Sequence, residues 1–185
     1  MTVQTMSTFF AVLSLACWVA TAAVVALAGV VRLGGGDRTL AALQDVGEVA
    51  LWAAWVVAAT TTAGSLYYSL GAHYLPCELC WYQRICMYPL AIVLAVAAAT
   101  RDRRVWRYVI GPAVIGTVIA VYHSQLQAYP AQRTFCASSN PCTTRYVWEF
   151  GFVSLPLMAL SAFVFIIAMV LVARWDPTPP TEEPS

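Results

Sequence analysis

Four of the six cysteines lie in two polar segments between long apolar stretches, and their thiols are the groups best suited to chemistry. Cys77 and Cys80 are three positions apart, which is close enough for a disulfide. Cys136 and Cys142 lie in the second segment. Because a thiolate attacks a disulfide, two such pairs on one side of a membrane can pass electrons between them. The pattern predicts a redox relay with all four cysteines as catalytic residues.

The residues around the first pair favour redox chemistry. Cys80 is expected to open a helix, where free backbone N–H groups and the helix dipole stabilise a thiolate. Arg84 follows four residues later, on the same helix face and about 6 Å deeper. A guanidinium at that depth is costly without a partner, although an arginine that only anchors the helix end is the simpler reading. We interpret Cys80 and Arg84 as one face of a binding site.

His123 and Gln127 form a second polar pair on one helix face, four residues apart and at a depth similar to that of Arg84. A lone histidine in a helix is more often a satisfied polar residue than a catalyst. Two donors at the layer of the dithiol suit the carbonyl oxygens of a flat, lipid-soluble acceptor and the charge that develops on them during reduction. A quinone has this chemistry, so we predict that Cys80, Arg84, His123 and Gln127 bind one.

The composition places these cysteines in a membrane protein. Hydrophobic residues make up 61% of the chain, charged residues 10%, and the mean hydropathy is +0.71. A bilayer core about 30 Å thick needs roughly 20 apolar residues per helix. Five segments meet this requirement with flanking residues included, near 8–32, 47–72, 81–100, 106–128 and 149–173. The first lacks a basic leader and is too long for an ordinary signal peptide, so we expect it to be a spanning helix.

We therefore predict an all-α, polytopic membrane protein, a four-helix bundle core with one additional N-terminal transmembrane helix. Residues 1–46 would hold that helix and a short inside loop at 33–46, residues 47–175 the four-helix domain, and residues 176–185 a disordered tail. The net charge of +1 gives no reason to expect a nucleic-acid partner. The partner that the composition does imply is the lipid bilayer.

All ten basic residues are arginine, and their positions predict the orientation. With five crossings, seven arginines fall on one side, which is expected to be cytoplasmic because cytoplasmic loops collect positive charge. The other three, Arg84, Arg133 and Arg145, lie near the opposite side. Both cysteine segments are then extracytoplasmic and the C-terminus is cytoplasmic. The seven inside positions are 32, 38, 101, 103, 104, 107 and 174.

Two simpler interpretations of the cysteines stay open. The pairs can be structural staples in an oxidising compartment, or a thiolate zinc site, since zinc proteins share the Cys-x-x-Cys spacing. No histidine or acidic ligand next to the pairs supports zinc, so we predict no metal. Cys17 and Cys86 lie inside apolar spans and are expected to be small buried hydrophobes.

The order of these features resembles the bacterial disulfide-bond formation protein B (DsbB) family, and the short second cysteine spacing is most similar to its Gram-positive BdbC-type members. The resemblance covers about residues 50–173. The residues that carry it are Pro76-Cys77-Glu78-Leu79-Cys80-Trp81-Tyr82-Gln83-Arg84, Met87-Tyr88-Pro89-Leu90, His123, Gln127, Tyr129-Pro130, Cys136, Pro141-Cys142, Trp148, Gly151 and Pro156.

The resemblance implies a thiol:quinone oxidoreductase in a bacterial plasma membrane that reoxidises an extracytoplasmic DsbA-like, thioredoxin-fold partner. A partner thiolate would attack the Cys136–Cys142 disulfide at Cys136. A disulfide between Cys77 and Cys136 would follow, leaving Cys80 as the thiolate that faces quinone, with Arg84 beside it. The electrons would enter the membrane quinone pool, with menaquinone favoured over ubiquinone.

Other functions fit the same pattern less fully. The vitamin K epoxide reductase family has similar chemistry but places its cysteine pairs in the opposite order. A non-catalytic stapled or zinc-binding membrane protein gives no reason for Arg84 to share a face with Cys80.

Overall fold

The computed structural model describes residues 2–34, 36–132, 136 and 140–175. The described chain is helical, with an isolated bridge between Glu149 and Val153 as its only β pairing. Five of its helices are long and apolar enough to cross a membrane, which confirms the all-α, polytopic architecture. The predicted disordered tail at 176–185 and Arg133 lie outside the described residues.

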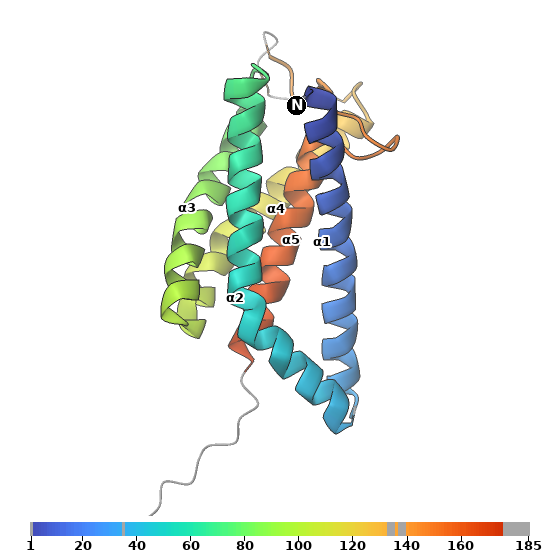
Figure 1. Cartoon of the computed structure of the whole chain (residues 1–185). Helices are drawn as coiled ribbons and strands as arrows, with labels where there is room; N and C mark the ends of the chain where they lie inside the picture. Colours follow the sequence, from blue (N-terminus) through green and yellow to red (C-terminus); the bar gives the residue numbers. More distant parts are fainter. Residues whose placement is uncertain (1, 35, 133–135, 137–139, 176–185) are drawn as a thin grey trace, which may run out of the picture.

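The five long helices run lengthwise through the molecule, with α1 at one side (Figure 1). Two short elements join them: a π-helical turn, η1 (Tyr67–Gly71), and a 3₁₀ turn, η2 (Arg103–Val105). The long helices are α1 (Val3–Arg32), α2 (Asp37–Leu66), α3 (Glu78–Thr100), α4 (Trp106–Ala128) and α5 (Leu155–Arg174).

The largest errors in the predicted boundaries are at the starts of α2 and α5. Residues 37–46, expected in a loop, form the start of α2, which runs obliquely away from the end of α1 before turning along the bundle (Figure 1). Helix-forming alanines and leucines fill this stretch, and Gly36 caps it. Residues 149–154, expected in the last helix, form a tight turn instead, with positive φ at Phe150 and Gly151. Pro156 then suits the first turn of α5.

The third helix begins at Glu78, three residues before the predicted start, and this changes the role of the first cysteine pair. Cys77 becomes the residue that caps the helix, because its Sγ accepts the backbone N–H of Cys80 at 3.4 Å. Pro76 precedes the cap with its φ already fixed. The thiol at the helix terminus is therefore that of Cys77.

The core lies between α2, α3, α4 and α5, where small residues let the helices approach. Gly116 of α4 faces Phe163 of α5, whose ring is completely buried. A Cβ at position 116 would lie 2.3 Å from the Phe163 Cζ atom, far inside contact distance. Glycine at this position lets α4 and α5 pack closely.

Gly116→Ala is expected to destabilise the protein by about 1–3 kcal/mol because the buried ring has to move. This cost exceeds the roughly 1 kcal/mol that alanine gains over glycine in a helix. Gly111 of the same helix has no atom within 4 Å of its would-be Cβ, so Gly111→Ala is the matched control and is expected to be neutral or stabilising. Thermal unfolding in detergent measures both, and an equal midpoint for the two variants would refute the packing argument.

Candidate redox site

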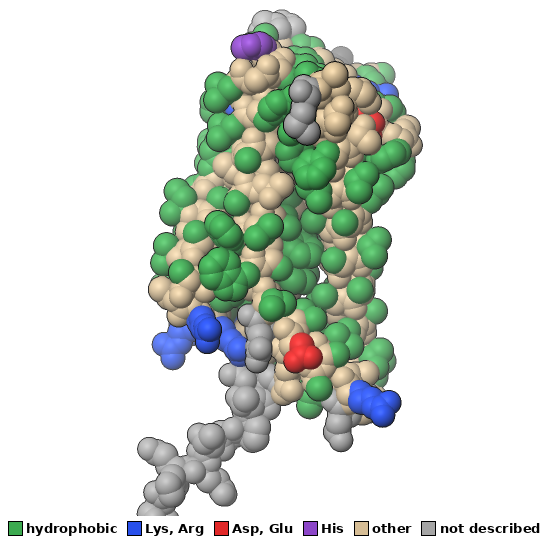
Figure 2. All heavy atoms as spheres, viewed as in Figure 1, with side chains coloured by type: hydrophobic (Ala, Val, Ile, Leu, Met, Phe, Trp, Pro, Cys, Tyr) green, Lys and Arg blue, Asp and Glu red, His purple; other side chains and the backbone are tan. Residues whose placement is uncertain are grey.

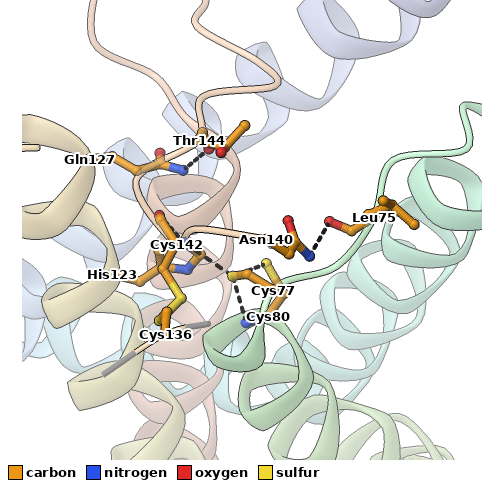
Figure 3. The surroundings of a disulfide bond; sticks show 9 residues. All are labelled: Leu75, Cys77, Cys80, His123, Gln127, Cys136, Asn140, Cys142 and Thr144. Carbon is orange, nitrogen blue, oxygen red and sulfur yellow. Dashed lines mark hydrogen bonds between the residues drawn. A yellow bond between two sulfur atoms is a disulfide. The ribbon is translucent and has the colours of Figure 1, made fainter. Parts of the chain in front are cut away.

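The two cysteine pairs meet at the end of the bundle where α3 begins and α4 ends. Cys77, Cys142, Leu79 and Leu126 form a small buried cluster, with Cys80 and Cys136 packed against it. Cys136 and Cys142 are joined by a disulfide, whereas Cys77 and Cys80 are free thiols whose sulfurs are 3.1 Å apart. Figure 3 shows the disulfide on one side of His123 and the Cys77–Cys80 pair on the other. The four cysteines predicted as catalytic therefore lie together.

His123 connects the two pairs. Its Nε2 atom lies 3.1 Å from the Cys142 carbonyl oxygen and 3.7 Å from the Cys77 sulfur (Figure 3). Because a carbonyl oxygen only accepts hydrogen bonds, Nε2 carries the proton in this arrangement. That N–H therefore contacts the Cys77 sulfur of one pair and the backbone of Cys142 in the other.

Hydrogen bonds to the Cys77 sulfur lower the pKa of this thiol, which lies outside the membrane-spanning segments. The Cys80 thiol makes the largest contribution, and with the His123 ring and the Cys80 amide it lowers the Cys77 pKa from 9.0 to about 4, although burial opposes the shift. The sequence placed the stabilised thiolate at Cys80. When both thiols of this pair are reduced, the hydrogen bonds favour a thiolate at Cys77 instead.

The reduced Cys77–Cys80 pair is therefore expected to keep a thiolate down to about pH 5 and to lose it near pH 4. His123→Ala should raise the Cys77 pKa because one donor is lost, and Cys80→Ala should raise it further because the strongest donor is lost. Thiolate ultraviolet absorbance, titrated in a background without Cys136 and Cys142, measures this. An unperturbed thiol pKa near 9 in the parent protein would contradict the geometry.

Hydrogen bonds and ring stacking hold the two loops in register. Asn140 donates to the Leu75 carbonyl oxygen at 3.2 Å (Figure 3). The rings of Tyr74 and Tyr146 stack with centroids 4.6 Å apart. These contacts tie the segment before Cys77 to the segment around Cys142.

Gln127 lies on the same face of α4 as His123, as predicted, but its hydrogen bonds go to the loop at Thr144 and Arg145. Its Nε2 donates to the Thr144 carbonyl oxygen at 2.9 Å, and its backbone carbonyl oxygen accepts from the Arg145 guanidinium. Gln127 and His123 line a cavity of about 20 Å³ together with both cysteines of the first pair. This space is large enough for one water molecule but not for a ring.

Arg84 lies on the other side of Cys80, where Ser65 of α2 fixes its position. The Arg84 Nε donates to the Ser65 Oγ at 3.0 Å, and a terminal nitrogen donates to the Ser65 carbonyl oxygen at 3.2 Å. Tyr88 also donates to that hydroxyl oxygen, and the Arg84 guanidinium lies 5.1 Å from the centroid of the Trp81 ring. The chain thus provides the partners that a half-buried guanidinium requires.

Arg84 and Cys80 line a second, much larger cavity of about 220 Å³ between α1, α2, α3 and α5. The sequence predicted that these two residues share a face, and the cavity is what they face together. His123 and Gln127 are not among its lining residues. The structure therefore separates the four predicted acceptor contacts into two groups, with Cys80 in both.

Gln83 is a polar cavity residue that was not predicted to belong to the site. Its side chain is buried and lines the large cavity, and its Nε2 has no hydrogen-bond partner within the described part of the chain. A buried amide donor left unpaired in this way costs free energy, so it points to a ligand. Its position in the helical sequence beside Arg84 was visible, but nothing in the sequence showed that it lacks a partner.

The ligating atoms of Cys77, Cys80 and His123 all lie within 4.8 Å of one another, which is the spacing of a metal site. The sequence offered no reason to place a histidine ligand beside the dithiol, whereas the fold brings His123 of α4 to it. Structural zinc sites use four protein ligands, whereas this group offers three. The zinc alternative thus gains a histidine ligand that sequence reasoning missed.

A sequence model of the DsbB disulfide bond formation protein family matches residues 47–173. The chain belongs to the DsbB family. It is similar to disulfide bond formation protein C of Bacillus subtilis (strain 168), with 43% identity over 130 residues that cover 69% of this chain and 94% of the relative. A probable disulfide formation protein of Coxiella burnetii (strain Dugway 5J108-111) is 39% identical over 68% of this chain and 88% of the relative.

A third DsbB-family relative is a probable disulfide formation protein C from Halalkalibacterium halodurans, which is 41% identical over 65% of this chain and 90% of its own length. No solved structure matches the chain. Family membership and the five apolar helices establish a membrane disulfide-formation protein with an oxidoreductase role. The helix α1 lies before the region that the family covers.

Proposed function

We propose that this protein is a thiol:quinone oxidoreductase that reoxidises an extracytoplasmic thioredoxin-fold dithiol protein and delivers the electrons to a membrane quinone. One observation carries the proposal: Cys80 lines both the small cavity beside Cys77 and His123 and the large apolar cavity beside Arg84. It thus joins the thiol-exchange side of the site to a space for a lipid-soluble acceptor.

The large cavity suits a quinone ring. An apolar protein cavity of about 150 Å³ holds a benzene-sized molecule, and this one is about 220 Å³. Most of its lining is apolar, and the Gln83 amide and the Arg84 guanidinium supply N–H donors at one side. A quinone bound there accepts two electrons and two protons and leaves as quinol. Positive charge at Arg84 stabilises negative charge both on the Cys80 sulfur and on an acceptor oxygen.

The electrons follow the thiols in three exchanges. A reduced partner dithiol reduces the Cys136–Cys142 disulfide and becomes a disulfide itself. The Cys136–Cys142 dithiol then reduces a Cys77–Cys80 disulfide through a bond between Cys77 and Cys136, releasing Cys80 as a thiolate. The Cys77–Cys80 dithiol returns to a disulfide when its two electrons leave toward the acceptor cavity. Free thiols at Cys77 and Cys80 beside an intact Cys136–Cys142 disulfide correspond to the state before this last step.

Solvent access favours Cys136 as the atom that the partner attacks. Cys142 is 1% exposed and its carbonyl oxygen is engaged by His123, whereas Cys136 is only half-buried. A protein thiolate needs in-line access to the sulfur that it attacks. The mixed disulfide with the partner therefore forms at Cys136, and Cys142 is the leaving thiol.

The arginines support an orientation with the cysteines outside the cell. On the face seen in Figure 2, most of the basic side chains gather at the end away from the N-terminus. The helix ends at Arg32, Thr100 and Arg174 share that end, opposite the start of α3. Because positive residues mark the cytoplasmic side, the cysteine end is extracytoplasmic and the C-terminus is cytoplasmic.

The test is quinone reduction by purified protein supplied with a reduced thioredoxin-fold dithiol protein. The assay uses a menaquinone and a ubiquinone analogue in parallel, with menaquinone expected to be preferred. Wild-type turnover that disappears in Cys136→Ser supports the relay, because this change removes the disulfide on which the partner acts. No turnover with either quinone would overturn the proposal.

The zinc alternative is tested on the same samples. Zinc content is measured after purification with the Cys77–Cys80 pair reduced. One tightly bound zinc per chain, released when the pair is oxidised and lost in His123→Ala, would favour a thiolate metal site. A zinc-free protein that turns over quinone leaves the oxidoreductase as the function.

A further inference from the structure

The N-terminal helix α1 forms one wall of the large cavity. Four of its residues line the space, Phe10, Leu13, Ser14 and Cys17. Their spacing of i, i+3, i+4 and i+7 is that of a single helix face. By the rise per residue they extend over about 10 Å of depth, so α1 contributes two full turns of wall.

Specific contacts hold this face of α1 against the bundle. The Ser14 and Ser161 hydroxyl groups form a hydrogen bond of 2.9 Å, and Tyr68 donates to the Ser7 hydroxyl at 3.1 Å. A Cβ on Gly64 of α2 would lie 2.8 Å from the Phe10 ring, so glycine is needed for the ring to lie there. Small polar residues at helix contacts are what membrane helices use to pack. These contacts fix the position of α1 beside the cavity.

The outer end of α1 is also tied to the redox side of the molecule. Gln4 donates to the Glu149 carboxylate at 2.7 Å and Thr8 donates to it at 3.3 Å. Glu149 belongs to the segment that leads from Cys142 to α5. These bonds and the Ser14–Ser161 contact hold α1 at both the top and the middle of the cavity.

The two sides of the cavity differ in chemistry. The donors that suit carbonyl oxygens, Gln83 Nε2 and the Arg84 guanidinium, come from α3. The side chains from α1 are apolar or, as with Ser14, already hydrogen-bonded, so this wall offers apolar contact. A ring held by α3 at its oxygens presents its hydrocarbon edge to α1.

Family membership does not account for this wall. The family region begins at residue 47, after α1 has ended. The match covers 94% of the Bacillus subtilis relative, and the remaining 6% is too short for another spanning helix, which takes roughly 20 residues. This chain therefore adds a helix to the acceptor cavity that its relative lacks.

We propose that α1 is part of the acceptor site, and that Leu13 and Cys17 contact the hydrocarbon edge of the quinone and help set which quinone the protein takes. The proposal rests on the quinone reduction proposed above. It assigns to the extra helix a role in substrate specificity, in addition to its role in packing.

The first test fills the cavity from the α1 side. Cys17→Trp places an indole in the space, and we expect the KM for quinone to rise at least about tenfold, with the KM for the partner dithiol unchanged. Val19→Trp is the matched control, since Val19 lies two residues away on the same helix and is 70% exposed. Equal quinone KM values for the two variants, both folded and turning over, would overturn the proposal.

The second test measures binding without turnover. In a Cys86→Ala protein with both redox pairs oxidised, Cys17 is the sole remaining thiol, because the chain has six cysteines. Its alkylation by N-ethylmaleimide is followed by mass spectrometry with and without a saturating quinone analogue. We expect quinone to slow the alkylation at least about tenfold, whereas a hydrocarbon of similar size without carbonyl groups should protect less.

The two tests separate the possible failures. Turnover of quinone with no protection of Cys17 and no effect of Cys17→Trp would refute the role of α1 and leave the oxidoreductase intact. Protection without any turnover would keep the site but refute the redox function. If Cys17→Trp does not fold, the alkylation result decides alone, and if Cys17 does not react, the quinone KM of the smaller variant Cys17→Leu decides.

Discussion

Cys80→Ser is expected to abolish steady-state quinone reduction while leaving the loop disulfide reactive. Cys80 is the redox-pair cysteine that lines the acceptor cavity, and loss of a catalytic nucleophile lowers turnover by more than about 10⁴-fold. The Cys136–Cys142 disulfide remains, so one equivalent of partner dithiol should still be oxidised per chain. A stopped-flow assay with reduced partner should show this single stoichiometric phase and no further turnover.

The control for this experiment is Cys86→Ala, which removes a buried thiol of the core that lines neither cavity. It should keep wild-type turnover per folded molecule. Continued turnover in Cys80→Ser would defeat the assignment of Cys80. Loss of the first, stoichiometric phase as well would show that Cys80 is needed before electrons reach the Cys136–Cys142 disulfide, against the order proposed.

Arg84→Met is expected to lower kcat/KM for quinone by about 10- to 100-fold. The change removes a positive charge beside the Cys80 sulfur and a donor that lines the cavity, and hydrogen bonds to charged groups contribute about 1.5–3 kcal/mol. Arg84→Lys keeps the charge but loses the two-point attachment to Ser65, so an intermediate loss is expected.

The step that precedes quinone provides the internal control for Arg84. Oxidation of the partner by the Cys136–Cys142 disulfide should keep its rate in both Arg84 variants, because Arg84 lies beyond Cys80 on the cavity side. An equal fall in both steps would instead indicate a general loss of structure. A wild-type quinone rate in Arg84→Met would mean that the guanidinium serves only to anchor α3 against α2.

Much of this architecture was predictable because it depends on local pattern. The five apolar stretches predict five spanning helices, and the four-residue step from Cys80 to Arg84 predicts their common face. The meeting of the two cysteine pairs followed from counting membrane crossings. Each of these inferences uses spacing along the chain, which a helix converts directly into position.

The parts that were missed depend on contacts between helices. The cavity is lined by Ser65 of α2, Gln83 of α3, one face of α1 and part of α5. No spacing within one segment reveals that these four helices leave a space between them. His123 was expected near the dithiol, and it lies 3.7 Å from the Cys77 sulfur, but its bond to the Cys142 carbonyl oxygen depends on the path of a loop. The Cys77 cap was missed because the helix starts three residues before its apolar run.

The small side chains of α1 have a consequence for how such proteins diversify. Ser7, Ser14 and Thr21 recur every seven residues and are buried, so α1 packs against the bundle along a narrow stripe of small side chains. None of the residues that exchange electrons lies in α1. Gain, loss or exchange of α1 would therefore alter the lipid-facing boundary of the protein and leave the four redox cysteines in place.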